Sequence, residues 1–264
     1  MIYQWAKKKD TPYVQDTVFQ KNFVADFAAT FNGKYKNLTI SDIDFSDAFK
    51  LVDKEKDARL LVTKEEKKSI AQKRKELREK YGIQENECVA LCVGQIQPRK
   101  GIYDFLKAAE LSPEIRFVWV GGRPFGRLTA DYANLTKACD HAPKNVLFTG
   151  IVDFKDMPAY YAMADIYFLP SYQENFAFAT IEAAAVKLPL VLRDNVEYPG
   201  TLFTHYLKGK TAEEFAKLIQ ELAKDKTHFQ KWQTESDTLA EKYELKSYMK
   251  TLISFYEEVA GEKK

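Results

Sequence analysis

The sequence has few cysteines and no long apolar run, and these absences narrow the class of protein. Its three cysteines, Cys88, Cys92 and Cys139, lack the spacing of a metal site. Cys88 and Cys92 flank an apolar run, which is typical of buried strand residues. No apolar stretch approaches the roughly 20 residues that a membrane-spanning helix needs, and the short, polar, lysine-rich start does not resemble a signal peptide. We therefore expect a cytoplasmic protein, either soluble or peripheral at the inner face of the membrane.

The sequence also lacks an excess of charge. Its formal net charge at pH 7 is +2, from 40 Lys and Arg against 38 Asp and Glu. That balance gives no sign of the basic surface that DNA- and RNA-binding proteins use, so we expect no nucleic-acid partner. Hydrophobic residues make up 45% and aromatic residues 14% of the 264 residues. This composition excludes a disordered chain and can bury one good core.

Short apolar runs alternate with helical patterns from about residue 87 onward. The alternation predicts an α/β fold, a Rossmann-like parallel sheet with helices on both faces. The predicted strands are Cys88–Val93, Phe117–Val120, Val146–Thr149, Ile166–Leu169 and Leu188–Leu192. The predicted helices are Ile102–Leu111, Asp131–His141, Met157–Met163 and Phe178–Val186. Such sheets bind ligands beyond the carboxyl ends of their strands, where the strand order reverses.

The two ends of the chain do not continue this alternation. Thr63–Tyr81 predicts a highly charged helix with a capping box, Thr63 followed by Glu66. Its few apolar residues favour a solvated linker helix over one that contacts an acidic membrane. The tail from Thr211 predicts further helices that end in a long C-terminal helix. We expect two parts, a helical N-terminal remnant with its linker (residues 1–62) and the α/β domain (residues 63–264).

The first candidate site is the turn from Gly94 to Gly101, between a predicted strand and a predicted helix. A glycine that ends the strand lets the backbone approach a ligand, and the helix N-terminus offers free N–H groups to a phosphate. Arg99 and Lys100 add two cations where a diphosphate would lie. Two exposed basic residues in an ordinary loop are the alternative interpretation.

The second candidate site is the pair Glu174 and Glu182, which are separated by seven residues. Glu174 follows the fourth predicted strand and Glu182 lies about one turn into the next helix, so both can face one pocket. Carboxylates accept hydrogen bonds well from sugar hydroxyls. The alternative is a loop acid and a solvated helix residue, but the surrounding residues Phe176, Phe178 and Ile181 are apolar.

Together the two sites resemble family 4 of the glycosyltransferases, a retaining group with the GT-B fold. The resemblance covers about residues 82–259, and its most specific part is the Glu174–Glu182 motif with the Ala-rich helix and Pro189 after it. The stretch LPSYQENF (residues 169–176) is most similar to enzymes of Gram-positive bacteria that build glycolipid anchors. Residues 63–264 then resemble the nucleotide-sugar-binding domain, and residues 1–62 a remnant of the acceptor-side domain.

The resemblance implies a role for each matching residue. Arg99 and Lys100 would contact the donor diphosphate, Glu174 the transferred sugar and Glu182 the ribose. These roles make Glu174, Lys100 and Arg99 the catalytic candidates. The implied donor-binding residues are Gly94, Gln95, Arg99, Lys100, Gly121, Ile151, Val152, Asn175, Phe176, Ala177 and Glu182. Family members generally need no metal, so we expect no cofactor beyond the donor itself, a UDP-sugar or similar nucleotide sugar.

Three departures from the family pattern leave more than one function open. Gln95 stands where the family usually has an arginine, and Lys187 where a glycine usually ends the helix. The acceptor-side domain and its sugar-facing histidine are nearly absent, and none of His141, His205 and His228 matches that histidine. We expect a hexosyltransferase that acts on a lipid or glycan acceptor. The alternative is a non-catalytic nucleotide-sugar-binding module that needs a partner subunit. A dehydrogenase is a weaker alternative, because the first turn lacks Gly-x-Gly-x-x-Gly.

Overall fold

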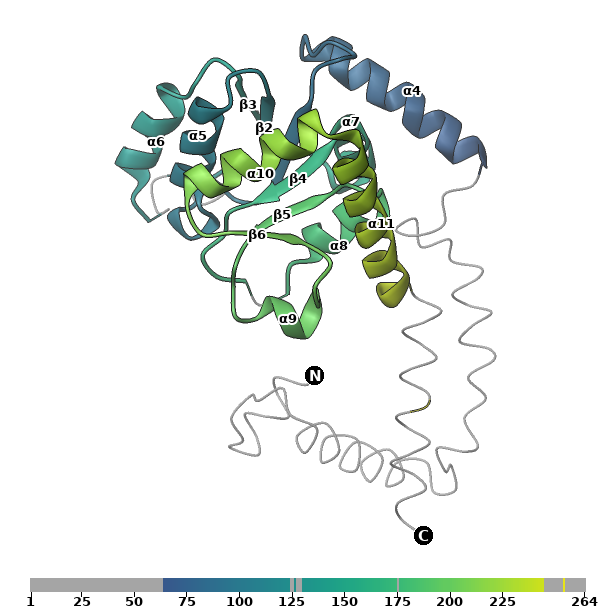
Figure 1. Ribbon diagram of the computed structural model, residues 1–264. Helices are drawn as coiled ribbons and strands as arrows, with labels where there is room; N and C mark the ends of the chain where they lie inside the picture. The colour runs from purple at the N-terminus through teal and green to yellow at the C-terminus, as the bar shows by residue number, and fades with distance from the viewer. Residues whose placement is uncertain (1–63, 124–125, 127–129, 175, 245–253, 255–264) are drawn as a thin grey trace, which may run out of the picture. The chain divides into compact units, whose positions relative to one another are not determined.

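The computed structural model describes residues 64–123, 126, 130–174, 176–244 and 254 (Figure 1). Almost all of these residues lie in one compact unit, Arg59–Tyr243. The capping residue Thr63, the expected helical remnant in residues 1–62 and the end of the expected C-terminal helix lie outside the described residues. The expected division at residues 62 and 63 therefore stays a prediction.

A six-stranded sheet forms the centre of this unit, in the order β3-β2-β1-β4-β5-β6, and all of its neighbouring strands pair in parallel. The strands are β1 (Val89–Val93), β2 (Arg116–Val120), β3 (Val146–Gly150), β4 (Ile166–Leu169), β5 (Leu190–Arg193) and β6 (Leu207–Gly209). The five predicted strands are confirmed. Analysis of the sequence missed β6 because its three residues, Leu-Lys-Gly, are too short and too polar to form an apolar run.

Helices cover both faces of the sheet, as the alternating pattern predicts (Figure 1). The α-helices are α4 (Lys64–Lys80), α5 (Ile102–Leu111), α6 (Tyr132–Asp140), α7 (Met157–Met163), α8 (Phe178–Ala185), α9 (Tyr198–Thr201), α10 (Ala212–Lys224) and α11 (Lys226–Tyr243). Two 3-10 turns are η2 (Pro98–Lys100) and η4 (Phe154–Asp156). Helix α10 packs against α5, α11 against α8 and α4 against α7. The right-handed connections of a parallel sheet place helices on opposite faces when the strand order reverses direction, as it does here.

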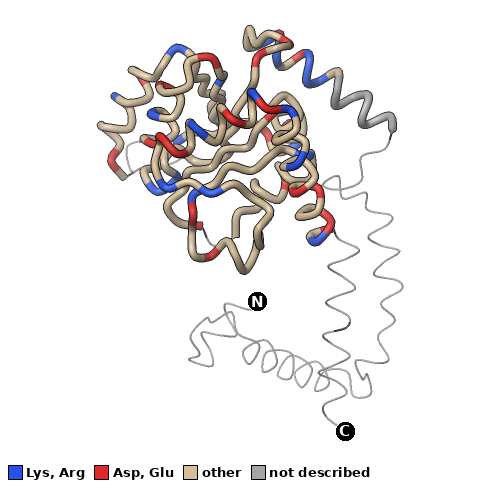
Figure 2. The backbone as a smooth tube through the Cα atoms, viewed as in Figure 1, with Lys and Arg blue, Asp and Glu red and all other residues tan. Residues whose placement is uncertain are grey.

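The core lies between the sheet and these helices. Strands of a parallel sheet that is covered on both faces are apolar on both sides, and the residues of β4 and β5 are buried throughout. On one face, Phe105 of α5 lies 5.5, 5.0 and 5.7 Å from the ring centroids of Phe117, Trp119 and Phe168. Figure 2 shows charged residues mainly on the helices and loops around a largely uncharged sheet.

The helix predicted over Thr63–Tyr81 lies at the surface, with most of the described side chains of α4 exposed, but it also packs on α7. Arg78 is only 1% exposed and pairs with Asp165 at 2.8 Å, and Arg74 pairs with the other oxygen of Asp165 at 2.9 Å. Arg78 also donates to the carbonyl of Met163 at the end of α7. A helix with few apolar residues is thus held by two arginines, whose stems pack while their guanidinium groups bind carboxylate and carbonyl oxygens.

Lys187 adopts the left-handed backbone conformation that its position predicts, with φ of 62°. It follows the end of α8, where a glycine would adopt this conformation without steric cost. The strain in a residue with a Cβ is roughly 1 kcal/mol. Its ammonium group binds Asp237 of α11 at 2.7 Å, so the side chain joins two helices that also pack on each other.

Candidate functional site

The reversal of strand order lies between β1 and β4, which are neighbours in the sheet although β2 and β3 separate them in the chain. The loops after these two strands therefore meet at the carboxyl edge of the sheet. There the Nζ atom of Lys100 lies 2.6 Å from Oε1 of Glu174, and the side chains are 17% and 8% exposed. The structure thus joins one residue from each predicted site in a largely buried ion pair.

The two loops are also joined through their backbones. The N–H of Tyr172 donates to the carbonyl of Arg99 at 2.8 Å, and the hydroxyl of Ser171 donates to the same oxygen at 3.2 Å. Gly101 has φ of 77°, and a Cβ atom on it would lie 2.2 Å from the carbonyl oxygen of Pro170. Only glycine fits this approach, so the sequence Lys-Gly at residues 100 and 101 fixes both the ammonium group and the contact between loops.

Arg99 has a partner within these loops. Its exposed guanidinium donates to the carbonyl of Gln173 at 2.5 Å, next to Glu174 in the chain. In this conformation Arg99 joins the two loops, so its predicted contact with a diphosphate would require the guanidinium to exchange partners. That role stays a prediction. Gln95, at the position where family members usually carry arginine, is exposed and accepts a hydrogen bond from Gln97 at 2.7 Å.

Gly94 lies against the Lys100 side chain, and Gly121 lies against Gly94. A Cβ atom on Gly94 would lie 3.7 Å from the stem of Lys100, and one on Gly121 would lie 2.0 Å from the carbonyl oxygen of Gly94. The indole N–H of Trp119 donates to that same oxygen at 2.8 Å. The turns after β1 and β2 are therefore close-packed backbone, which leaves the space above them to side chains or a ligand.

Glu182 has a different partner from Glu174. The hydroxyl of Tyr161 on α7 donates to Oε2 of Glu182 on α8 at 2.6 Å. Burial raises the pKa of Tyr161 well above its ordinary value, and the nearby charge of Glu182 raises it further. Tyr161 therefore stays a donor at every physiological pH. The prediction that the two glutamates face one pocket stays untested.

The other predicted residues lie along the same edge of the sheet. Ile151, directly after β3, is 71% exposed, and Val152 is partly buried. Phe176 packs against Phe178 at 4.7 Å between ring centroids and against Tyr243 of α11 at 5.6 Å. Ala177 is the residue before α8, and Asn175 lies outside the described residues. The roles of these residues in binding stay predictions.

Analysis of the sequence missed Arg193, which supports the loop that carries Glu174. Arg193 ends β5 and is 9% exposed. Its guanidinium donates to the carbonyl of Pro170 at 2.9 Å, forms an ion pair with Asp104 of α5, and lies 3.9 Å from the centroid of the Tyr172 ring. The Tyr172 hydroxyl donates to Asp104 at 2.6 Å, which closes the network. An arginine at the end of an otherwise apolar strand was the available signal.

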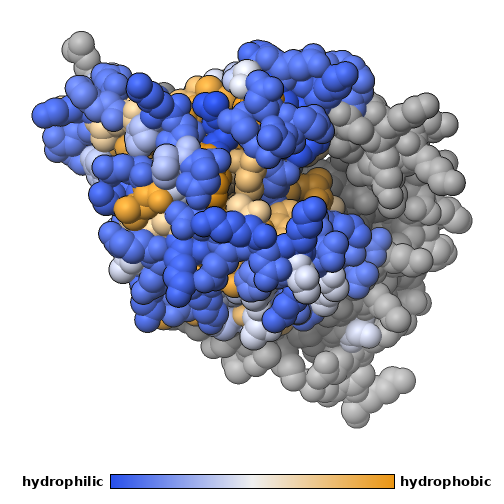
Figure 3. All heavy atoms as spheres, turned by 45° about the horizontal axis from the view of Figure 1, so that its top comes forward, coloured by the Kyte–Doolittle hydropathy of each residue, from blue (hydrophilic) through white to orange (hydrophobic). Residues whose placement is uncertain are grey.

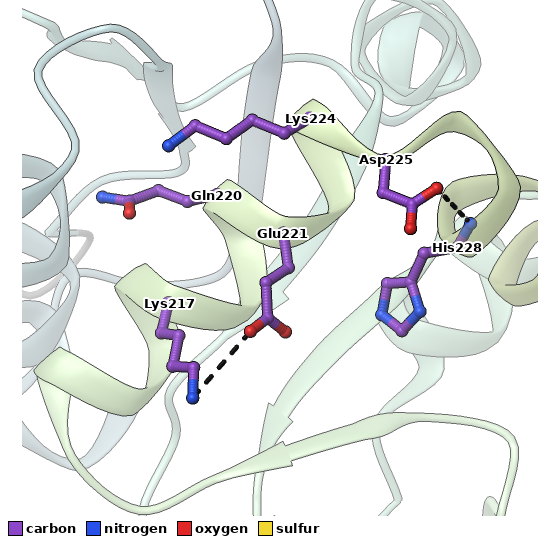
Figure 4. Close-up of a pocket in the computed structure, with 6 residues that line it drawn as sticks. All are labelled: Lys217, Gln220, Glu221, Lys224, Asp225 and His228. Atoms are coloured by element: carbon purple, nitrogen blue, oxygen red, sulfur yellow. Dashed lines mark hydrogen bonds and ion pairs between the residues drawn. The ribbon is translucent and has the colours of Figure 1, made fainter.

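A groove of about 390 Å³ lies at the opposite edge of the sheet. Helix α10 starts at the carboxyl edge after β6 and runs back, so its last turns lie at the amino edge. The groove is lined by Lys217, Gln220, Glu221, Lys224, Asp225 and His228 (Figure 4). None of the predicted donor-binding residues lines it. In Figure 3, which turns the top of Figure 1 forward, hydrophilic residues surround a smaller area of exposed apolar surface.

Two absences concern only the part of the chain that the structure describes. Within it, no group of three or more His, Cys, Asp and Glu side chains could hold a metal ion. Within the same residues, no helix is long and apolar enough to cross a membrane. Two expectations therefore stay predictions: that the protein needs no metal ion, and that it is cytoplasmic.

Comparison with protein families gives one match over most of this unit. The model of the family described as Glycosyl transferases group 1 matches residues 73–238. A second model, Eukaryotic DNA topoisomerase I, DNA binding fragment, matches residues 1–97. This second match covers less than half of the chain, and its described part is α4 and β1, which form part of the sheet domain. It therefore carries no functional conclusion.

Two curated relatives are glycolipid glycosyltransferases. The chain is 34% identical to the alpha-galactosylglucosyldiacylglycerol synthase of Streptococcus pneumoniae, over 70% of this chain and 50% of that protein. It is 35% identical to the processive diacylglycerol alpha-glucosyltransferase of Acholeplasma laidlawii, over 55% of this chain and 43% of that protein. The chain spans about half the length of these relatives. The predicted resemblance to glycolipid glycosyltransferases is confirmed.

Solved structures support the fold. Anabaena Alr3699/HepE in complex with UDP and glucose is 21% identical, with a TM-score of 0.57 over 65% of this chain and 48% of that one. One chain of the GtfA/B complex is 18% identical, with a TM-score of 0.55 over 67% of this chain and 37% of that one. At these identities the likeness shows the fold alone, and it confirms the predicted α/β architecture of a GT-B domain.

Proposed function

The chain belongs to the glycosyl transferases group 1 family, and we propose that it carries the donor-binding half of a retaining glycosyltransferase. This enzyme transfers a hexose from a nucleoside-diphosphate sugar, most simply a UDP-sugar, to a lipid or glycan acceptor. The observation that supports the proposal best is the ion pair between Lys100 and Glu174 at the reversal of strand order. It joins the cation that we propose to bind the diphosphate with the carboxylate that we propose to bind the sugar, at the edge where such sheets bind ligands.

The proposed chemistry is electrostatic. When the bond between the anomeric carbon and the diphosphate oxygen breaks, negative charge develops on the leaving diphosphate. Lys100 and the N-terminal turn of α8 would stabilise that charge, and Glu174 would accept hydrogen bonds from the sugar hydroxyls at the lone-pair sites that Lys100 leaves free. A preformed ion pair keeps both groups close to their working positions before the donor binds, which lowers the cost of reorganisation. The proposal needs no metal ion.

The binding of the diphosphate is tested with the double substitution Arg99→Ala and Lys100→Ala. Charge-assisted hydrogen bonds contribute roughly 1.5–3 kcal/mol each, so calorimetry should show nucleoside diphosphate binding weakened at least roughly tenfold. Lys107→Ala is the matched control, because Lys107 lies on α5 and pairs only with the exposed Glu110 among the contacts described. If the double variant binds the nucleoside diphosphate with unchanged affinity, Arg99 and Lys100 do not bind the diphosphate.

The two glutamates should have separable roles. Glu182→Ala should weaken the binding of the free nucleotide, because its proposed partner is the ribose. Glu174→Ala should leave the free nucleotide almost unaffected and weaken the nucleotide sugar, because its proposed partner is the hexose. Titration of each variant with UDP, GDP and ADP, and then with the matching nucleotide sugar, separates the two roles. If both variants behave alike, the roles are misassigned.

The names of the relatives support a proposal for the acceptor, and the share of their length that this chain covers supports one for a partner. The Streptococcus and Acholeplasma proteins are named for diacylglycerol glycolipids, and we extend a lipid acceptor, with a peripheral position at the inner face of the membrane, to this chain. Because the chain spans about half the length of those relatives, the site described supplies one wall of the cleft. We propose that a second protein chain or segment supplies the acceptor side.

The same half-length match favours a second candidate function, a module that binds nucleotide sugar without transferring it. Turnover distinguishes the two candidates. The purified chain is incubated with a panel of sugar nucleotides and diacylglycerol or sugar acceptors, and product is measured with and without an added acceptor-side domain. We expect slow transfer or none from the chain alone. Robust turnover by the isolated monomer would contradict the need for a partner.

A further inference from the structure

Two adjacent tyrosines on α7 place their hydroxyl groups against different partners. Tyr160 is 5% exposed and Tyr161 is 3% exposed, so both rings are part of the core. The hydroxyl of Tyr160 lies 3.0 Å from the hydroxyl of Tyr81, which directly follows α4. The hydroxyl of Tyr161 donates to Oε2 of Glu182 on α8 at 2.6 Å. One tyrosine therefore connects α7 to the α4 region, and the other connects it to the proposed ribose-binding residue.

The hydrogen bond from Tyr161 limits the orientation of the Glu182 carboxylate. Glu182 is only partly buried, but Ala183 and Ala184, the next residues of α8, are fully buried, so the helix backbone under the carboxylate is fixed. A glutamate side chain keeps three rotatable bonds, and a donor on one oxygen removes most of that freedom. An ionised carboxylate has about four lone-pair sites, and Tyr161 has one proton to donate. Glu182 therefore keeps acceptor capacity in a defined direction.

We propose that Tyr161 is a positioning residue for nucleotide recognition: it holds Glu182 so that the carboxylate accepts hydrogen bonds from the ribose hydroxyls of the donor. This inference rests on the proposed function and assigns a role to a residue that touches neither the donor nor the acceptor. A hydroxyl group that acts through Glu182 matters only when the ligand carries ribose hydroxyls. That dependence separates positioning from a general contribution of Tyr161 to packing.

The experiment compares Tyr161→Phe with Tyr160→Phe by calorimetric titration. Each substitution removes one hydroxyl from a buried ring of the same helix and leaves the ring in place. The ligands are UDP and its 2′,3′-dideoxy analogue. Tyr161→Phe should bind UDP roughly tenfold more weakly, the size expected for a hydrogen bond to a charged group. It should bind the dideoxy analogue as the unchanged protein does, and Tyr160→Phe should bind both ligands normally.

A double substitution adds a second readout. With Glu182→Ala already present, Tyr161→Phe should weaken UDP binding no further, because a residue that acts through Glu182 has nothing left to position. Binding of the dideoxy analogue by Tyr161→Phe also shows that this variant is folded. Equal losses for UDP and the analogue would assign Tyr161 to packing and overturn the inference. So would an unaffected Tyr161→Phe in a protein whose UDP binding depends on Glu182.

Failure of the proposed function gives a different pattern. If the unchanged protein binds no nucleoside diphosphate, or if Glu182→Ala binds UDP normally, then Glu182 does not recognise ribose and the inference fails with that assignment. If the unchanged protein binds UDP, and Glu182→Ala weakens that binding, the proposed function stands whatever the result for Tyr161→Phe. The two hypotheses are therefore tested by separate variants in one series of titrations.

Discussion

Each edge of the sheet carries a carboxylate in an ion pair with a basic residue, and both pairs are largely buried. They differ in how many of their hydrogen-bonding positions are filled by other groups of the chain. At the amino edge, the two oxygens of Asp165 accept from Arg74 and Arg78, and the N–H of Val89 adds a third hydrogen bond at 2.9 Å. At the carboxyl edge, Glu174 Oε1 accepts from Lys100. An ammonium has three donors and a carboxylate about four lone-pair sites, so this pair keeps capacity for a ligand.

An ion pair whose hydrogen-bonding positions are filled within the chain is structural, and one with positions left over is a candidate site. Burial alone does not distinguish the two. Arg78 donates to Asp165 and to the carbonyls of Met163, Gln84, Glu85 and Glu87. All three nitrogens of its guanidinium therefore have partners within the chain. We expect substitutions at the amino edge to change stability most, and substitutions at the carboxyl edge to change binding most.

Asp165→Asn should have the largest effect on stability. An amide in place of the carboxylate would turn an –NH₂ group toward N–H donors, and it would leave the buried Arg78 without its counter-charge. Breaking one partner of a buried ion pair typically costs about 3–5 kcal/mol, which urea denaturation would measure. Asp153→Asn is the control, since its pair with Lys155 is 73% and 78% exposed. If the free energy of unfolding falls by less than about 1 kcal/mol, the ion pairs of Asp165 contribute no more than ordinary surface pairs do.

Gly101→Ala should have the next largest effect, at the carboxyl edge. The left-handed φ costs an alanine about 1–2 kcal/mol, and the overlap with the carbonyl of Pro170 costs about 1–3 kcal/mol more. Gly82 is the matched control, because its φ is 65° but no atom lies within 4 Å of an added Cβ. Gly82→Ala should therefore cost only the backbone part. Equal losses in the two variants would show that the loops move apart without resistance.

Cys88 should make stability depend on alkaline pH. Burial, and after it the charge of Asp165, raise the pKa of this thiol to about 12, although the charge of Arg78 acts in the opposite direction. Because the folded pKa lies above the ordinary value of 9.0, this contribution to stability is complete below pH 9 and is lost as pH rises toward 12. The free energy of unfolding should fall between pH 9 and 12, by at most about 1.4 kcal/mol per pH unit from this group. Cys88→Ala should flatten that fall, and an unchanged slope would contradict the assignment.

Glu174→Gln should have the smallest effect on stability, about 1 kcal/mol or less. The amide oxygen can still accept from Lys100, whose side chain is 17% exposed and can reach water. Affinity for the nucleotide sugar should nevertheless fall, while that for the free nucleotide stays. Thermal unfolding and calorimetry on the same preparation measure both quantities. A loss of stability as large as that of Asp165→Asn would remove the distinction between the edges.

The parts of the fold that depend on periodic apolar residues were predictable. The strands of the α/β domain that are four or five residues long follow from short apolar runs, and a glycine or proline ends each of β1 to β4. The docking of α4 was not predictable, because arginines hold it and their partner, Asp165, lies about 90 residues away in the chain. Arg193 was missed for the same reason. Its role depends on Asp104 and Pro170, which only the folded chain brings together.

Hydrogen–deuterium exchange with and without a UDP-sugar reports where on the molecule the ligand binds. We expect slower exchange in peptides that cover Gly94–Gly101 and the start of α8, at the carboxyl edge. We expect no change in peptides from residues 217–228, which line the groove at the amino edge. Protection of residues 217–228 without protection of Gly94–Gly101 would contradict a donor site at the carboxyl edge.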